Sequence, residues 1–115
     1  DMHRKGRLSS ILQHKAEIWK NVEEKEMDEL GTFPIIEKCI KSVYCAVIPQ
    51  TGGLLSGRTA DTTLSRTTHK IVIRYMEGIT PDMWLMIESQ RYNIIYALDP
   101  YLNKERLELF CEVIM

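Results

Sequence analysis

Apolar and polar residues alternate with a period of two through most of the second half of the chain. In residues 68–75 (THKIVIRY), one face carries His69, Ile71, Ile73 and Tyr75, and the other carries Lys70, Val72 and Arg74. In residues 91–99, one face carries Tyr92, Ile94, Tyr96 and Leu98. In residues 106–114, one face carries Leu107, Leu109, Cys111 and Val113. Half-buried strands show this alternation and are rich in β-branched and aromatic residues, so the pattern predicts three β-strands.

Two further segments complete the predicted β-structure. Residues 83–89 (MWLMIES) form a short apolar strand that leads into a tight turn at Ser89–Gln90, and residues 37–49 (EKCIKSVYCAVIP) form a strand that stops at Pro49. Gly- and Pro-containing segments separate the later strands at a spacing of roughly ten residues. This arrangement predicts an all-β fold, a small antiparallel barrel or sandwich of about six strands.

The N-terminal third carries two overlapping patterns. Seven residues recur at the spacing of one helix face, which favours a helix over residues 8–22: Leu8, Ile11, Leu12, Lys15, Ile18, Trp19 and Val22. Residues 15–21 (KAEIWKN) also alternate, with Ala16 and Ile18 opposite Glu17 and Trp19, which leaves a strand open. The acidic segment that follows, residues 22–31 (VEEKEMDELG), is typical of a solvated loop or a helix end.

Length and composition limit the classes of function. A chain of 115 residues predicts one domain, residues 1–115. The 15 basic and 16 acidic residues give a net charge of −1, which does not support nonspecific nucleic-acid binding. No apolar run approaches the ~18–20 residues of a membrane span, so we expect no membrane partner. Three cysteines, Cys39, Cys45 and Cys111, cannot all pair within one chain, which favours reduced thiols in a cytoplasmic setting.

A glycine-rich segment lies between two predicted strands. Gly52, Gly57, Arg58 and Thr59 follow G-x-x-x-x-G-R-T, one residue type away from the phosphate-binding P-loop. A P-loop opens a helix, whereas the residues after Thr59 are poor helix formers, and Arg58 does not reproduce the point contact of a lysine. We therefore interpret residues 50–66 as a long loop that a partner orders.

Other chemistry finds little support in the sequence. The three histidines have no ligand spacing with one another or with the cysteines, so we expect no metal and no cofactor. No nucleophile and base can be paired beyond chance, and we expect no enzymatic activity and no catalytic residue.

The order of segments resembles the phage head–tail joining proteins of tailed phages, the head-closure, stopper or adaptor family. The resemblance spans nearly the whole chain and is strongest in the second half. It rests on a T-H-K-I-x-I-R-Y strand through His69, Lys70, Arg74 and Tyr75, a Y-x-I-x-x-x-x-D strand through Tyr92, and a closing strand through Arg106 and Glu108. Residues 43–49 (VYCAVIP) resemble the family's W-A-x-I-x-P strand, with Tyr44, Cys45 and Ala46 where Trp-Ala is usual.

The resemblance implies a small β-barrel or sandwich with a long loop between the second and third strands. It changes the N-terminal expectation to a strand at about Lys15–Val22, after an N-terminal leader (residues 1–14) in which Arg7–Leu12 is extended or forms one turn. The long loop, residues 50–66, would then contact neighbouring copies or the DNA channel. Its candidate residues are Gly52, Gly53, Leu54, Leu55, Gly57, Arg58 and Leu64.

The implied function is structural. Family members form rings, expected to be dodecameric, in the neck of a virion or phage-like particle made in the bacterial host cytoplasm. The implied partners are other copies of the chain, a portal or adaptor ring on the head side, and a tail terminator or tail tube protein on the tail side, with DNA only as passing cargo. The alternative is a small β-barrel that binds an oligonucleotide or another ligand through Lys70, Arg74, Arg91 and Tyr92.

Overall fold

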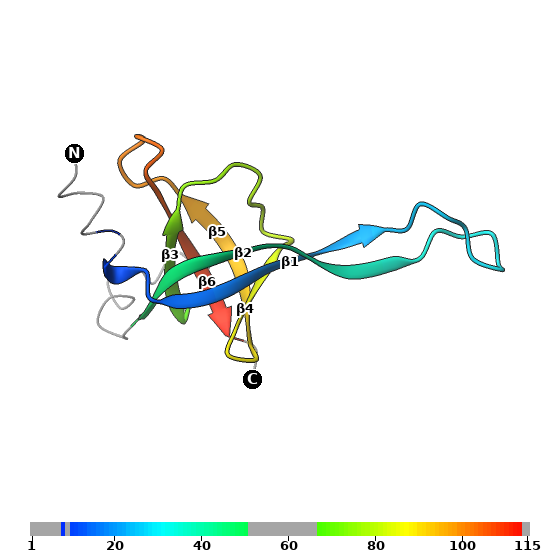
Figure 1. Ribbon diagram of the computed structural model, residues 1–115, viewed down its shortest axis with the longest axis horizontal. Coiled ribbons are helices and arrows are strands. Elements are labelled where there is room, and N and C mark those ends of the chain that lie inside the picture. The colour runs from blue at the N-terminus through cyan, green and yellow to red at the C-terminus, as the bar shows by residue number, and fades with distance from the viewer. Residues whose placement is uncertain (1–7, 9, 51–66, 114–115) are drawn as a thin grey trace, which may run out of the picture.

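Six antiparallel strands form a closed barrel in the computed structural model, which describes residues 8, 10–50 and 67–113 (Figure 1). The strands are β1 (His14–Glu23), β2 (Ile35–Pro49), β3 (His69–Arg74), β4 (Trp84–Ile87), β5 (Gln90–Leu98) and β6 (Arg106–Val113). Around the barrel they follow the order β1-β2-β3-β6-β5-β4, and pairing of β1 with β4 closes it. The all-β prediction is confirmed, and the closed order selects a barrel over a sandwich.

The apolar side chains on one face of each strand point into the barrel interior, as the two-residue alternation of apolar and polar positions predicts. Twelve residues form this core: Ala16, Ile18, Cys45, Ile71, Ile73, Met83, Leu85, Ile87, Ile94, Leu107, Leu109 and Cys111. Every strand contributes at least one of them, so the core ties distant parts of the sequence together. Burial of apolar area at ~25 cal/mol per Å² is the main force that stabilises this arrangement.

The N-terminal third forms a strand rather than the helix that helical spacing favoured. β1 pairs with β2 on one side and with β4 on the other, and Ala16 and Ile18 point into the core. Tertiary pairing therefore outweighs helical periodicity here, and the strand expected from the family resemblance is confirmed. Before β1, the chain makes one helical turn in which the Leu12 amide donates to the Leu8 carbonyl at 3.2 Å. Leu8 and Leu12 cover the outer face of Ala46 and Val72.

Two irregularities in strand pairing redirect side chains. The pairing of β5 with β6 shifts between Ile94 and Tyr96, so Ile95 is an extra residue on β5. Tyr96 consequently leaves the inner face and stacks on Phe110, with ring centroids 4.7 Å apart, while Ala97 packs against the core. The expectation that Tyr96 and Leu98 share a face with Ile94 is therefore wrong, because one inserted residue reverses the alternation. A similar shift leaves Ile40 of β2 unpaired against β1.

A tight turn joins β4 to β5 close to the predicted place. Its two residues are Glu88 and Ser89, with φ values of 50° and 67°. Two consecutive left-handed residues match the right-handed twist of the strands they connect. The turn lies one residue earlier than the predicted Ser89–Gln90.

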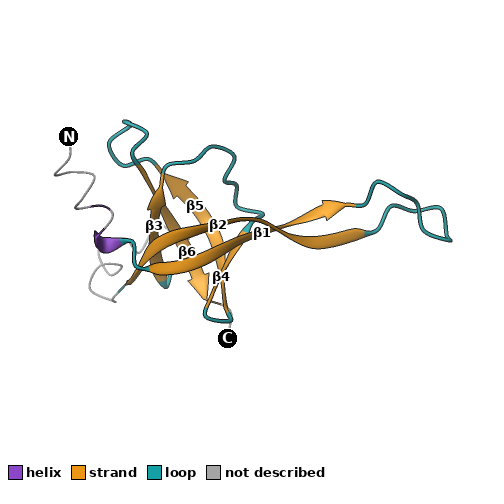
Figure 2. Cartoon of the chain, in the orientation of Figure 1, coloured by secondary structure: helices purple, strands orange, loops and turns teal. Residues whose placement is uncertain are grey.

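The hairpin of β1 and β2 extends well beyond the barrel. β1 pairs with β4 only as far as Trp19, and β2 pairs with β3 only from Cys45 onward. Beyond these points the two strands pair only with each other, and the loop between them forms the far end of the molecule (Figure 2). We call residues 20–38 the arm. It contributes to the longest dimension of the molecule, 53 Å.

Candidate assembly site

The arm exposes large apolar side chains that the barrel does not cover. Leu30 is 88% exposed, Ile35 is 72% exposed and Met27 is 62% exposed. Phe33 and Ile36 are exposed as well. A cluster of exposed apolar groups on one projection is typical of a surface that a partner protein covers.

A hydrogen-bonded turn at the end of the arm holds Leu30 outward. The Asp28 carboxylate accepts from the Leu30 amide at 2.9 Å, from the Thr32 amide at 3.0 Å and from the Thr32 hydroxyl at 2.7 Å. Gly31 closes the turn with φ of 81°, a left-handed value that glycine adopts without strain. Hydrogen bonds from Thr32 lower the pKa of Asp28. The arm therefore presents Leu30 in a defined conformation.

The arm is also strongly acidic for its size. It contains six acidic residues and three lysines, a net charge of −3, while the whole chain carries −1. The rest of the chain therefore carries +2. At the base of the arm, Glu37 lies 3.8 Å from Arg91, whose guanidinium sits 4.0 Å from the centroid of the Trp84 ring.

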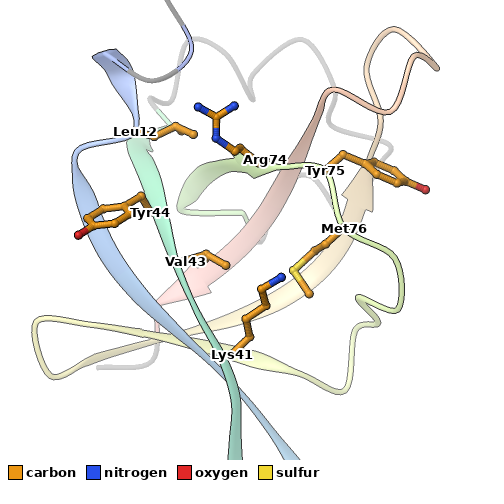
Figure 3. Close-up of a pocket in the computed structure, with 7 residues that line it drawn as sticks. All are labelled: Leu12, Lys41, Val43, Tyr44, Arg74, Tyr75 and Met76. Atoms are coloured by element: carbon orange, nitrogen blue, oxygen red, sulfur yellow. The ribbon is translucent and has the colours of Figure 1, made fainter. Parts of the chain in front are cut away.

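A pocket of about 310 Å³ opens beside β2 at the base of the arm (Figure 3). The described residues that line it are Leu12, Lys41, Val43, Tyr44, Arg74, Tyr75 and Met76. Lys41 reaches toward Met76, and the Tyr44 ring turns away from the opening. Two of the seven lining residues are basic and none is acidic, so the pocket combines apolar walls with positive charge.

The structure brings the predicted strand residues together in pairs rather than at one site. His69 and Tyr92 meet edge to face with ring centroids 5.3 Å apart. Burial lowers the pKa of His69 and raises that of Tyr92. Lys70 and Glu108 form an ion pair of 3.5 Å between β3 and β6.

Three further residues of the family motifs, Arg74, Tyr75 and Arg106, lie where β3 ends beside the start of β6. Arg74 pairs in register with Arg106, and the Arg106 guanidinium lies 5.9 Å from the centroid of the Tyr101 ring. The Tyr75 amide donates to the Glu105 carbonyl at 3.1 Å. Of these, Arg74 and Tyr75 line the pocket.

The predicted loop residues, Gly52, Gly53, Leu54, Leu55, Gly57, Arg58 and Leu64, lie outside the described residues. The ends of their segment are anchored, because the Gln50 amide donates to the Thr68 carbonyl at 2.9 Å. β2 and β3, which flank the loop, are antiparallel neighbours, whereas a P-loop joins a strand to a helix.

In the described part of the chain, no three His, Cys, Asp or Glu side chains come together as metal ligands. No helix among the residues that the structure describes is long and apolar enough to span a membrane. All three cysteines are free, and burial raises the pKa of Cys45 to about 11 and that of Cys111 to about 12.

Sequence comparison identifies the family. The family described as phage head completion protein matches residues 8–114. The chain belongs to this family. As a head completion family member it is a structural protein associated with the phage virion. A comparison with curated proteins found no match.

Solved structures share the fold of this head completion family member. The solution structure of protein SF1141 from Shigella flexneri 2a has a TM-score of 0.69 at 19% identity, covering 89% of this chain and 92% of that one. A chain of the native gene transfer agent virion has a TM-score of 0.57 at 13% identity, covering 90% of this chain and 96% of that one. At these identities the likeness concerns the fold.

Sequence reasoning did not identify the arm and the pocket as functional features of this family member. The sequence pattern predicts a solvated loop or a helix end for the acidic segment, whereas in the structure Asp28 and Gly31 occupy the first and fourth positions of a turn. Such a turn signal between two alternating segments could have indicated a hairpin. The pocket joins residues from three separate parts of the chain, and no local pattern shows that.

Proposed function

We propose that this protein forms a ring, expected to be dodecameric, that joins the portal or adaptor side of a phage head to the tail terminator or tail tube. In this proposal the ring closes or lines the channel through which DNA passes. Family membership supports a role in completing the head.

The arm is the observation that carries this proposal. It places Leu30, Ile35 and Met27 in solvent on a projection that adds nothing to the barrel core. Exposing apolar area in a monomer has no benefit for folding, whereas burying it between copies stabilises an assembly. Identical subunits in a closed ring offer such burial to every copy.

The near-neutral charge of the chain suits a channel that DNA crosses. DNA contacts made with many basic residues bind tightly and depend on salt. Here Lys70 faces Glu108 and Arg91 faces Glu37, so two of the basic residues considered for nucleic-acid binding already have acidic partners. A wall without a strong basic patch lets DNA slide. The same pairs weaken the alternative of an oligonucleotide-binding barrel.

A mass measurement of the purified protein, alone and with tail and head precursors, tests the proposal. We expect a ring-sized species, formed at high concentration or on the particle. A chain that stays monomeric at every concentration and never joins a particle contradicts the proposal. Tight, salt-dependent binding of a single-stranded oligonucleotide by that monomer supports the alternative.

A loop deletion tests the part of the proposal that concerns residues 50–66. Removing residues 52–63 leaves the Gln50–Thr68 hydrogen bond and the β2–β3 pairing in place, so we expect a folded barrel. We expect the deletion to impair ring assembly or head closure. Circular dichroism checks the fold, and normal joining of heads to tails by the deletion variant refutes a role for the loop.

A further inference from the structure

We propose that the tip of the arm docks into the Lys41–Arg74 pocket of a second copy of the chain, and that this contact repeats around the assembly. The proposal rests on the proposed ring, and it names the two surfaces that meet within it. One surface is the turn that presents Leu30, and the other is the pocket beside β2.

The two surfaces complement each other in charge. The tip, residues 24–34, carries four acidic residues and one lysine. The pocket is lined by Lys41 and Arg74, and none of the seven described residues that line it is acidic. Complementary potentials of this kind steer association and fix the register of a contact.

The two surfaces also complement each other in apolar character and shape. Leu30 projects from a turn that Asp28 holds with three hydrogen bonds, so little conformational freedom is lost on docking. The pocket measures about 310 Å³ and has apolar walls that include Leu12, Val43 and Met76. A space of this size can accept a leucine side chain together with part of the neighbouring turn.

The tip cannot reach the pocket of its own chain. Lys41 stands on the same strand as Ile35, six residues away, which is roughly 20 Å at the strand rise of ~3.3 Å per residue. The tip lies farther out still, at the end of a hairpin that points away from the barrel (Figure 1). Docking therefore requires another copy. Because the donor and acceptor surfaces differ, the contact is heterologous and propagates from copy to copy, closing a ring when the rotation allows.

Engineered disulfides test the contact directly. A chain with Leu30→Cys and Met76→Cys, in a Cys39→Ser background, is oxidised with copper–phenanthroline at assembling concentration. We expect a ladder of covalent oligomers in denaturing gels. The control replaces Leu102 instead of Leu30, since Leu102 is 86% exposed on a different loop, and we expect no ladder from it. Dimers alone indicate reciprocal exchange and overturn the repeating contact, and equal ladders from both chains overturn the docking site.

A second measurement separates this inference from the proposed function. Leu30→Asn is compared with Leu102→Asn for self-association by sedimentation. Leaving a leucine out of an apolar pocket weakens self-association by roughly 10- to 100-fold, and we expect this loss only for Leu30→Asn. If both variants and wild type form the same rings and join heads to tails, the docking site is wrong while the ring stands. If wild type neither self-associates nor joins particles, the proposed function itself is wrong.

Discussion

Ile71 and Ile35 offer a test of the barrel and the arm with the same chemical change at two sites. Ile71 is fully buried between β2 and β6, whereas Ile35 is 72% exposed on the arm. Truncating a buried isoleucine to alanine lowers the free energy of unfolding by about 2–5 kcal/mol, because the site loses apolar burial and keeps a cavity. Truncating an exposed one changes it by about 0.5 kcal/mol or less.

These magnitudes translate into separable melting temperatures. For a chain of this length, 1 kcal/mol corresponds to about 4 °C in Tm. We expect Ile71→Ala to lower Tm by about 8–20 °C and Ile35→Ala to lower it by about 2 °C or less. Scanning calorimetry of dilute, monomeric protein measures both. An equal loss at the two positions refutes the projecting arm, and an unchanged Tm for Ile71→Ala refutes the assigned core.

Three further predictions concern the thiols and an ion pair. At pH 8 we expect iodoacetamide to modify Cys39 in the folded protein and to leave Cys45 and Cys111 intact, which mass spectrometry measures. The reason is that burial raises the pKa of Cys45 from 9.0 to about 11 and that of Cys111 from 9.0 to about 12. Above about pH 9 the unfolded state loses these thiol protons while the folded state keeps them, so the free energy of unfolding falls as pH rises, by up to ~1.4 kcal/mol per pH unit for each thiol. A urea midpoint that does not fall between pH 9 and pH 11 contradicts this pH dependence. The Lys70 Nζ and a Glu108 carboxylate oxygen lie 3.5 Å apart, and both side chains are mostly covered. A double-mutant cycle with Lys70→Met and Glu108→Gln should therefore give a coupling free energy of about 0.2–1 kcal/mol that decreases in ~1 M salt. A coupling free energy that salt does not change contradicts an ion pair.

The strands of the second half were predictable because each buries one face. Alternation in residues 68–75 and 106–114 is read directly from neighbouring residues, and the structure keeps Ile71, Ile73, Leu107 and Leu109 inside as expected. The alternation failed within β5, at Ile95, because an extra residue there reverses the faces. Whether a strand contains an extra residue depends on how it pairs with its partner, here β6, and the alternation within residues 91–99 does not show that pairing.

The N-terminal half was harder to predict because its patterns compete. Leu8 and Leu12 continue a helical spacing into β1, although they cover the outer face of the barrel while Ile18 fills its interior. Leu30, Ile35 and Met27 of the arm are each more than 60% exposed, so a rule based on burial could not distinguish this segment from a solvated loop. The candidate site therefore required the fold, since the pocket combines Leu12, Lys41 and Arg74 from separate elements.

Closure of the barrel has a consequence for the proposed assembly of many identical copies. Each strand of the barrel has a neighbouring strand on both sides, so none of them is an edge strand along its whole length. An open sheet crowded among identical copies invites edge-to-edge pairing and unlimited polymerisation. In the described part of the chain, β1 and β2 pair only with each other where they leave the barrel, and Lys20 and Lys38 lie opposite each other there. Charged side chains on such an edge disfavour pairing with a further strand. In the proposed assembly, identical copies can therefore contact one another through side chains without their sheets joining edge to edge into fibres.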